Sequence, residues 1–267
     1  MNNFDLTAIT GDRRRRYREM LDFYHGRQWP SIRREDKRLT FNYAAAVVDK
    51  LTAYLMNGLS VRAVSLDGSA GSKAAAARAQ HLLDKARSYN NLDRLDYETE
   101  IDAAVLGDGC YRLGWDAAAG TVRVTSPDIA GIDADYAVDG VTVEKVTLNY
   151  TVFKAVAFQA WGFDSPNRDV DVVETWTAGA FEVACGGEIV SGRDNPFGFI
   201  PFIVFPNLPR PKSFWGASDL EPLFEVQREL NRSTSQLSRI LELSGNPIAV
   251  LENVESSQDI AVTPGAV

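Results

Sequence analysis

The feature that most constrains the fold is a helical pattern of apolar residues near the end of the chain, from Ser218 to about Ser244. Ser218 and Glu221 have the spacing of a capping box, and Gly245 follows the end of the pattern. At 1.5 Å per residue the helix measures roughly 40 Å, which is long for a small domain. Its apolar side comprises Leu220, Leu223, Leu230, Leu237 and Leu241, and its charged side Glu221, Glu225, Arg228, Arg232 and Arg239.

Ahead of this helix, the spacing of apolar residues changes from a helical period to a strand period at Gly107. Upstream we expect helices over residues 12–24, 41–57, 73–89 and 92–106, and a short strand over 61–66. Downstream we expect extended segments over residues 110–115, 121–125, 141–158, 170–177, 181–185, 188–190, 202–205, 248–251 and 260–262. The sequence therefore predicts an α+β fold, in which a mixed helical and antiparallel β body precedes the long helix.

The charge is distributed unevenly along the 267 residues. The net charge is −8, yet residues 1–40 carry ten Lys and Arg against six Asp and Glu. With 45% hydrophobic and 24% charged residues, the chain is not wholly disordered or disulfide-rich. Part of this charge is a basic segment formed by Arg13, Arg14, Arg15 and Arg16. Three interpretations of the segment are open: it contacts phosphates, it pairs with an acidic neighbour, or it is a solvated helix end.

The residues that usually support catalysis are few. Cys110 and Cys185 are the only cysteines and His25 and His81 the only histidines, and no spacing brings them together. We expect both thiols to be reduced and unpaired, in a reducing compartment. There is also no phosphate-binding P-loop motif. We predict a protein without catalytic, metal or cofactor sites, and also without a signal peptide or membrane span.

Two pairs of aspartates leave an alternative open. Asp133 with Asp135, and Asp169 with Asp171, place two carboxylates on one side of a strand. Paired carboxylates can hold Mg²⁺ for nuclease chemistry. No Lys or His accompanies either pair at a useful spacing, so turn and solvent-facing positions are favoured. A metal-dependent nuclease remains one alternative, and a monomeric interaction module is another.

Several segments carry a family resemblance through their shared order. An aromatic-x-Gly element at 24–28 is followed by an Asn…Val-Asp…Gly helix at 42–58 and a small-residue helix into a strand at 104–115. A Gly-x-Ile-Pro…Asn segment lies at 196–207. Most specific is residues 216–221, which lead through Gln227, Asn231 and Ser235 to Asn246-Pro247-Ile248. In this order the segments resemble the portal proteins of tailed bacteriophages, in the siphovirus-like family.

The resemblance implies a portal fold, with a wing domain over 1–215, a first stem helix over 216–245 and the start of a clip region over 246–267. The family continues with a second stem helix, a tunnel loop and a crown, so we expect a partial sequence. The implied function is a dodecameric ring, assembled in the bacterial host cytoplasm, at the virion capsid vertex where DNA is packaged and ejected. Implied partners are other copies of the chain, the terminase motor, capsid and scaffolding proteins, the tail connector and double-stranded DNA bound without sequence preference, but no membrane.

The net charge agrees with this function, because a channel rich in Lys and Arg would bind DNA rather than let it slide. On the long helix, Arg228, Arg232 and Arg239 share one face by spacing. Three possibilities are open for these arginines: they are solvated, they pair with acidic residues of the adjacent subunit, or they contact DNA phosphates in the tunnel. The acidic composition favours pairing between subunits over contact with DNA. We expect the leucine side to pack on the body and on neighbouring stems.

Overall fold

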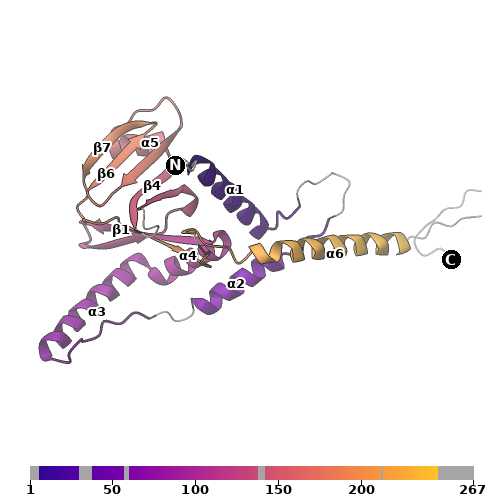
Figure 1. The fold of residues 1–267 in the computed structure, drawn as a ribbon, viewed down its shortest axis with the longest axis horizontal. Helices are drawn as coiled ribbons and strands as arrows, with labels where there is room; N and C mark the ends of the chain where they lie inside the picture. The colour runs from indigo at the N-terminus through magenta and orange to yellow at the C-terminus, as the bar shows by residue number, and fades with distance from the viewer. Residues whose placement is uncertain (1–5, 30–37, 57–59, 138–141, 212, 246–267) are drawn as a thin grey trace, which may run out of the picture.

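A computed structural model describes residues 6–29, 38–56, 60–137, 142–211 and 213–245. Figure 1 shows a mixed body of helices and strands at one end of an elongated molecule. Helix α6 (Phe224–Gly245) projects from the body in one direction, and α3 (Ala70–Asn90) extends in another. The α+β fold with a long C-terminal helix is therefore confirmed. The expected clip region, residues 246–267, lies outside the described residues.

The helices of the body are α1 (Leu6–Tyr24), α2 (Tyr43–Leu55), α4 (Leu92–Leu106) and α5 (Lys154–Trp161). Several of their ends are defined by capping or left-handed residues. The Asn42 side chain accepts from the amide of Ala45 at the start of α2. Asn91, at φ 49°, turns the chain between α3 and α4. Gly107 ends α4 at φ 98°, and a Cβ there would lie 2.9 Å from the Ala217 carbonyl carbon.

A three-stranded antiparallel sheet connects the middle of the chain to the segment before α6. Its order is β2-β1-β8, with β1 (Asp108–Asp116) in the centre. The strand β2 (Thr121–Thr125) forms the expected hairpin with β1. On the other edge, β8 (Phe202–Pro206) pairs with residues 108–112 of β1. This pairing places the chain leaving β8 beside the end of α4, where α6 begins.

A five-stranded antiparallel sheet follows the chain order without crossovers. It consists of β3 (Ile132–Tyr136), β4 (Val143–Phe153), β5 (Asp169–Trp176), β6 (Ala180–Cys185) and β7 (Glu188–Asp194). Gly186 and Gly187, at φ 57° and 90°, form the expected two-residue loop between β6 and β7. In β5 and β6, buried and exposed residues alternate, so one face of the sheet is covered and the other meets solvent.

Two local expectations are wrong. Residues 61–65 form no strand, because their backbone bonds to a side chain instead: the amide of Ala63 donates to Gln80 of α3 at 2.8 Å. Residues 154–158 belong to α5 rather than to the preceding strand, which ends at Phe153. Both segments are apolar and short, and such runs do not by themselves distinguish a strand from other structure.

The core of the body divides into two clusters of buried side chains. The larger joins α1, α2, α4, β1, β3 and β4, and includes Leu220 from the segment just before α6. The smaller lies under the five-stranded sheet around Val172 and Trp176, and includes Ala157 of α5. No helix in the described part of the chain combines the length and the apolar character needed to cross a membrane.

Candidate functional site

Apolar side chains anchor the base of α6 in the body. Leu220 is fully buried in the larger core cluster, and Leu223 and Phe224 pack against the same cluster. The ring of Phe224 lies 4.1 Å from that of Phe23 in α1, measured between centroids. The guanidinium of Arg228 lies over both rings, at 5.3 and 5.9 Å. Leu220 and Leu223 therefore pack on the body, as predicted.

A network of amide side chains determines which side of α6 faces the body. Asn231 is 1% exposed, and its Oδ1 accepts from the amide of Phe41 at 3.0 Å. Its Nδ2 donates to Oε1 of Gln28 at 2.6 Å. Gln227 donates through Nε2 to the Phe41 carbonyl at 2.5 Å and to Asn231 Oδ1 at 3.1 Å. Because buried amides require partners, this network fixes the rotation and position of α6 on the body.

The expectation that the leucine side of this helix packs on the body is wrong beyond the first turn. Gln227, Asn231 and Ser235 recur every four residues and so lie on one face of α6. The Ser235 hydroxyl oxygen accepts from the amide of Leu39 at 2.9 Å, which extends the contact by one more turn. The four-residue spacing of these polar side chains was visible in the sequence and could have indicated a contact face. The spacing did not identify the partner segment, which lies nearly 200 residues earlier in the chain.

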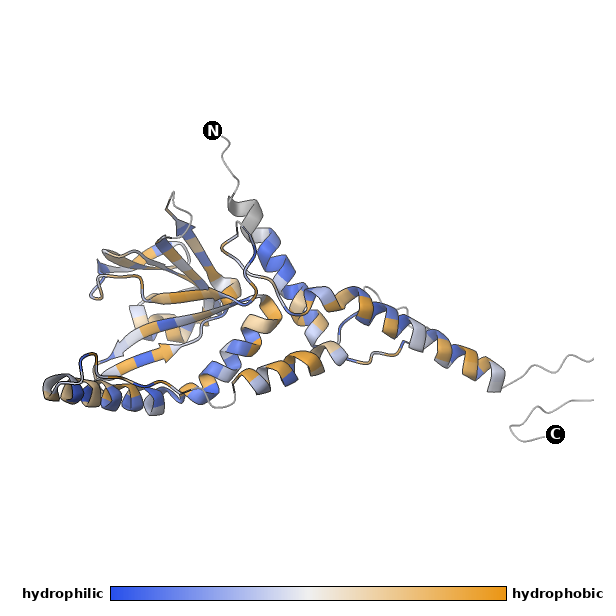
Figure 2. Ribbon diagram, turned by 60° about the horizontal axis from the view of Figure 1, so that its bottom comes forward, coloured by the Kyte–Doolittle hydropathy of each residue, from blue (hydrophilic) through white to orange (hydrophobic). Residues whose placement is uncertain are grey.

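A row of apolar side chains occupies another side of α6. We call Val226, Leu230, Leu237 and Leu241 the apolar stripe. They are 71, 37, 55 and 62% exposed, respectively. At 100° per residue, all four fall within an arc of roughly 60°. Hydrophobic residues recur along the projecting helix in Figure 2. The far half of the leucine side thus forms an apolar surface that is covered only in part.

The arginine face of α6 carries ion pairs within the helix. Arg228 pairs with Glu225 at 3.4 Å and Arg232 with Glu229 at 3.7 Å, each three residues away. These side chains are more than half exposed, so each pair contributes little to stability. Arg239 is exposed and has no ion pair among the described residues. For Arg228 and Arg232 the acidic partner lies on their own helix.

The predicted capping box does not form. The chain from Glu221 to Leu223 is a short 3-10 helix, and α6 itself begins only at Phe224. The Glu221 carboxylate binds Arg210, so it does not cap the helix and does not lie on its charged face. The Ser218 hydroxyl accepts from the Leu220 amide at 3.0 Å and otherwise bonds back to the body.

The basic segment of α1 finds acidic partners within the chain. Arg13 and Arg14 both bind the carboxylate of Asp133 at 2.8 Å. The guanidinium of Arg13, 95% buried, also lies 3.7 Å from the ring centroid of Trp215. The other two arginines pair as follows: Arg15 with Asp12 at 2.9 Å, and Arg16 with Glu221 at 4.0 Å. Of the three interpretations of this segment, pairing with an acidic neighbour agrees with all four contacts.

A buried carboxylate joins α1, β1 and the approach to α6. Asp108 is fully buried and accepts from the Tyr17 hydroxyl at 2.6 Å and from the Gly216 amide at 2.7 Å. Burial raises the pKa of the Asp108 carboxyl, and burial beside this carboxyl raises the pKa of Tyr17. The Ser218 hydroxyl donates to the carbonyl of Ala104 at 2.9 Å and so ties the same approach to α4. No local pattern of residues indicated this junction.

The aspartate pairs do not gather into a metal centre. Asp133 is occupied by two arginines, and Asp135 binds Lys145 at 2.5 Å. Asp169 and Asp171 are exposed on the same face of β5. Over the described ranges, no three His, Cys, Asp or Glu side chains come together as metal ligands. No observation on these residues favours the nuclease alternative.

The two cysteines lie in separate cores and are not bonded to each other. Cys110 belongs to the larger cluster and Cys185 to the smaller one. Burial raises the pKa of the Cys110 thiol to about 12, which opposes formation of a reactive thiolate. His25 and His81 are both exposed, at the end of α1 and on α3. The described geometry therefore places no histidine beside a thiol nucleophile.

No protein-family model matches the chain, and a comparison with curated proteins finds no match.

Proposed function

We propose that this chain is a subunit of a portal ring of a tailed bacteriophage, with the α+β body as the wing and α6 as the first stem helix. Copies of the chain stand side by side around a channel for double-stranded DNA at one capsid vertex. The ring is assembled in the bacterial host with capsid and scaffolding proteins, then binds the terminase motor and later the tail connector. The observation that carries the proposal is the apolar stripe on a helix that projects from the body.

The energetics of the stripe support association between stems. Complete burial of a Val or Leu side chain contributes about 1.5–3 kcal/mol. The four stripe residues are already partly covered, so half of this value for each gives about 3–6 kcal/mol at every contact. In a closed ring each subunit makes this contact on two sides, which offsets the loss of free motion on association.

The charges of α6 support a channel that does not hold DNA. Arg228 and Arg232 are neutralised by glutamates of their own helix, and the whole chain has a net charge of −8. Free Lys and Arg along a tunnel would bind phosphates tightly and with strong salt dependence. Arg239 is the one of the three arginines without an ion pair among the described residues. Its candidate partners are an acidic residue of the adjacent stem and a DNA phosphate.

The proposal is tested by imaging the purified protein in negative stain and by comparing two variants. Leu237→Asp places a charge in the stripe, whereas Ile189→Asp places the same charge at an exposed apolar position of β7, outside α6. We expect ring particles for the unchanged chain and for Ile189→Asp, and smaller species for Leu237→Asp at the same concentration.

Two results would contradict the proposal. One is a chain that stays monomeric at every concentration tested, which would favour a monomeric interaction module. The other is a Leu237→Asp variant that forms the same rings as the unchanged chain, because the stripe would then have no part in assembly.

A further inference from the structure

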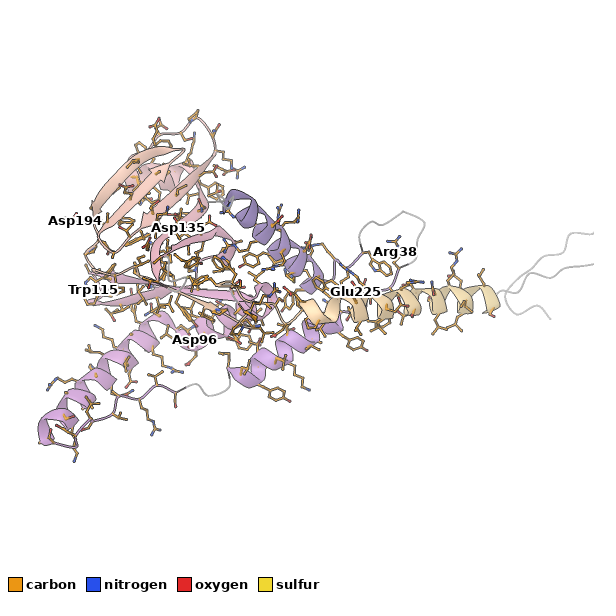
Figure 3. All side chains as sticks on the ribbon, viewed as in Figure 1. Arg38, Asp96, Trp115, Asp135, Asp194 and Glu225 are labelled. Atoms are coloured by element: carbon orange, nitrogen blue, oxygen red, sulfur yellow. The ribbon has the colours of Figure 1, made fainter. Side chains whose placement is uncertain are left out.

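A groove with an aromatic floor opens between α1 and the first turns of α6. Its volume is about 890 Å³. The rings of Phe23 and Phe224, tilted by 44° to each other, form part of its floor, and Trp29 lines it as well. Charged residues surround these rings, among them Glu19 of α1 and Glu225 of α6. Figure 3 labels Glu225 where α6 leaves the body. The groove thus combines an apolar floor with a charged rim.

The groove and the apolar stripe lie on opposite sides of α6. The charged residues by which α6 lines the groove are Glu225, Arg228, Glu229 and Arg232. At 100° per residue, the mean direction of these four lies roughly 140° from that of the stripe. One helix therefore presents two unlike surfaces, facing away from each other.

Helix α2 adds apolar surface on the side of the stripe. In both Figure 1 and Figure 2, α1 and α2 lie on opposite sides of the base of α6. The backbone of Phe41, two residues before α2, bonds to Gln227 and Asn231 of α6. Among the exposed side chains of α2, four large apolar or aromatic ones recur at intervals of three or four residues, and we call them together with the stripe the apolar face. They are Tyr43, Val47, Leu51 and Tyr54.

The charges beside the two surfaces are complementary. Glu19, on the rim of the groove, has no cationic partner among the described residues. Lys50 of α2 contacts the ring of Tyr54 and has no carboxylate partner in the described part of the chain. The groove therefore has an unpaired negative charge, and the apolar face has an unpaired positive charge. Opposite charges of this kind orient one surface on another.

We propose that the groove between α1 and α6 receives the apolar face of a second copy of this chain. Two unlike, complementary surfaces on opposite sides of one subunit give head-to-tail association, which closes into a ring when the rotation allows it. The inference rests on the proposed ring and names the two surfaces that meet in it. Glu19 of one copy then lies near Lys50 of the next.

Photochemical cross-linking tests which surfaces meet. The photoreactive residue benzoylphenylalanine replaces Glu229 in the groove, and near-ultraviolet light makes its ketone insert into a C–H bond within reach. We expect a product of doubled mass in which the groove is linked to residues 41–55 or 226–241. The matched control places the same residue at Glu188, at the exposed start of β7, where we expect no such product.

The outcomes separate this inference from the proposed function. Rings in which the groove links only to other segments, or only within one copy, would overturn the inference and leave the ring intact. The expected link in an assembly that is not a ring would support the pairing of surfaces and count against the portal function. A monomer without links between copies would overturn both.

Exchange of the two unpaired charges gives a second, independent measurement. Glu19→Lys and Lys50→Glu each place like charges together, and we expect each to weaken self-association roughly fivefold per contact. The double variant restores opposite charges and should recover most of the loss. A double variant that associates no better than either single variant would overturn the orientation of the groove on α2.

Discussion

Replacement of Asn231 by alanine tests whether the amide network holds α6 on the body. The side chain of Asn231 is fully buried and bonds to the Phe41 amide, to Gln28 and to Gln227. Gln227 keeps its bond to the Phe41 carbonyl in the variant, so two groups lose their partner: the partly buried Phe41 amide and the buried Oε1 of Gln28. A buried group left unpaired costs about 1–3 kcal/mol, and a partly buried one costs less because water reaches it. We expect the free energy of unfolding to fall by about 2–4 kcal/mol.

The assay is urea unfolding followed by circular dichroism. Self-association would make the apparent stability depend on concentration, so both variants are measured in the Leu237→Asp background. The matched control is Gln236→Ala, an exposed amide on the same helix, for which we expect a change within about 0.5 kcal/mol. A loss below about 0.5 kcal/mol for Asn231→Ala would refute the argument, because the network would then contribute nothing to the position of α6.

Three further predictions concern the body. Gly107→Ala should lower the free energy of unfolding by about 1–3 kcal/mol, measured by urea unfolding, because φ is 98° and the methyl group meets backbone. Arg112→Met leaves the buried Glu174 carboxylate without its 2.7 Å ion pair, and we expect a loss of about 3 kcal/mol in the same assay. Cys110 and Cys185 should resist iodoacetamide at pH 8 in the folded chain and react in urea, because burial raises their pKa values; rapid labelling of the folded protein would contradict this.

Local signals in the sequence predicted much of the secondary structure. The glycine pair at 186–187 and the left-handed positions Asn91 and Gly107 mark turns through their own backbone preferences, and the structure has those turns. The helix over 92–106 has the predicted bounds. By contrast, the strand expected at 61–66 has no partner strand. A segment becomes a strand only when another is available to pair with it, and the sequence does not show which one.

The candidate site was predicted only in part, because its defining contacts join distant segments. The spacing of Leu230, Leu237 and Leu241 correctly placed them on one side of the helix. Which side faces the body depends on Asn231 meeting Gln28, 203 positions earlier, and no local pattern encodes that meeting. The capping box failed for a similar reason, since Glu221 binds Arg210 instead. The helical spacing of the apolar residues alone predicted that leucine side chains, rather than amide side chains, would pack on the body.

Native mass spectrometry of the unchanged chain decides whether a ring forms, because it counts the subunits in the assembly. We expect one closed oligomer, with a mass that is a whole multiple of 29.4 kDa. We also expect this species to be lost in Leu237→Asp and retained in Ile189→Asp. A single species at 29.4 kDa, or a dimer that does not grow with concentration, would contradict the account.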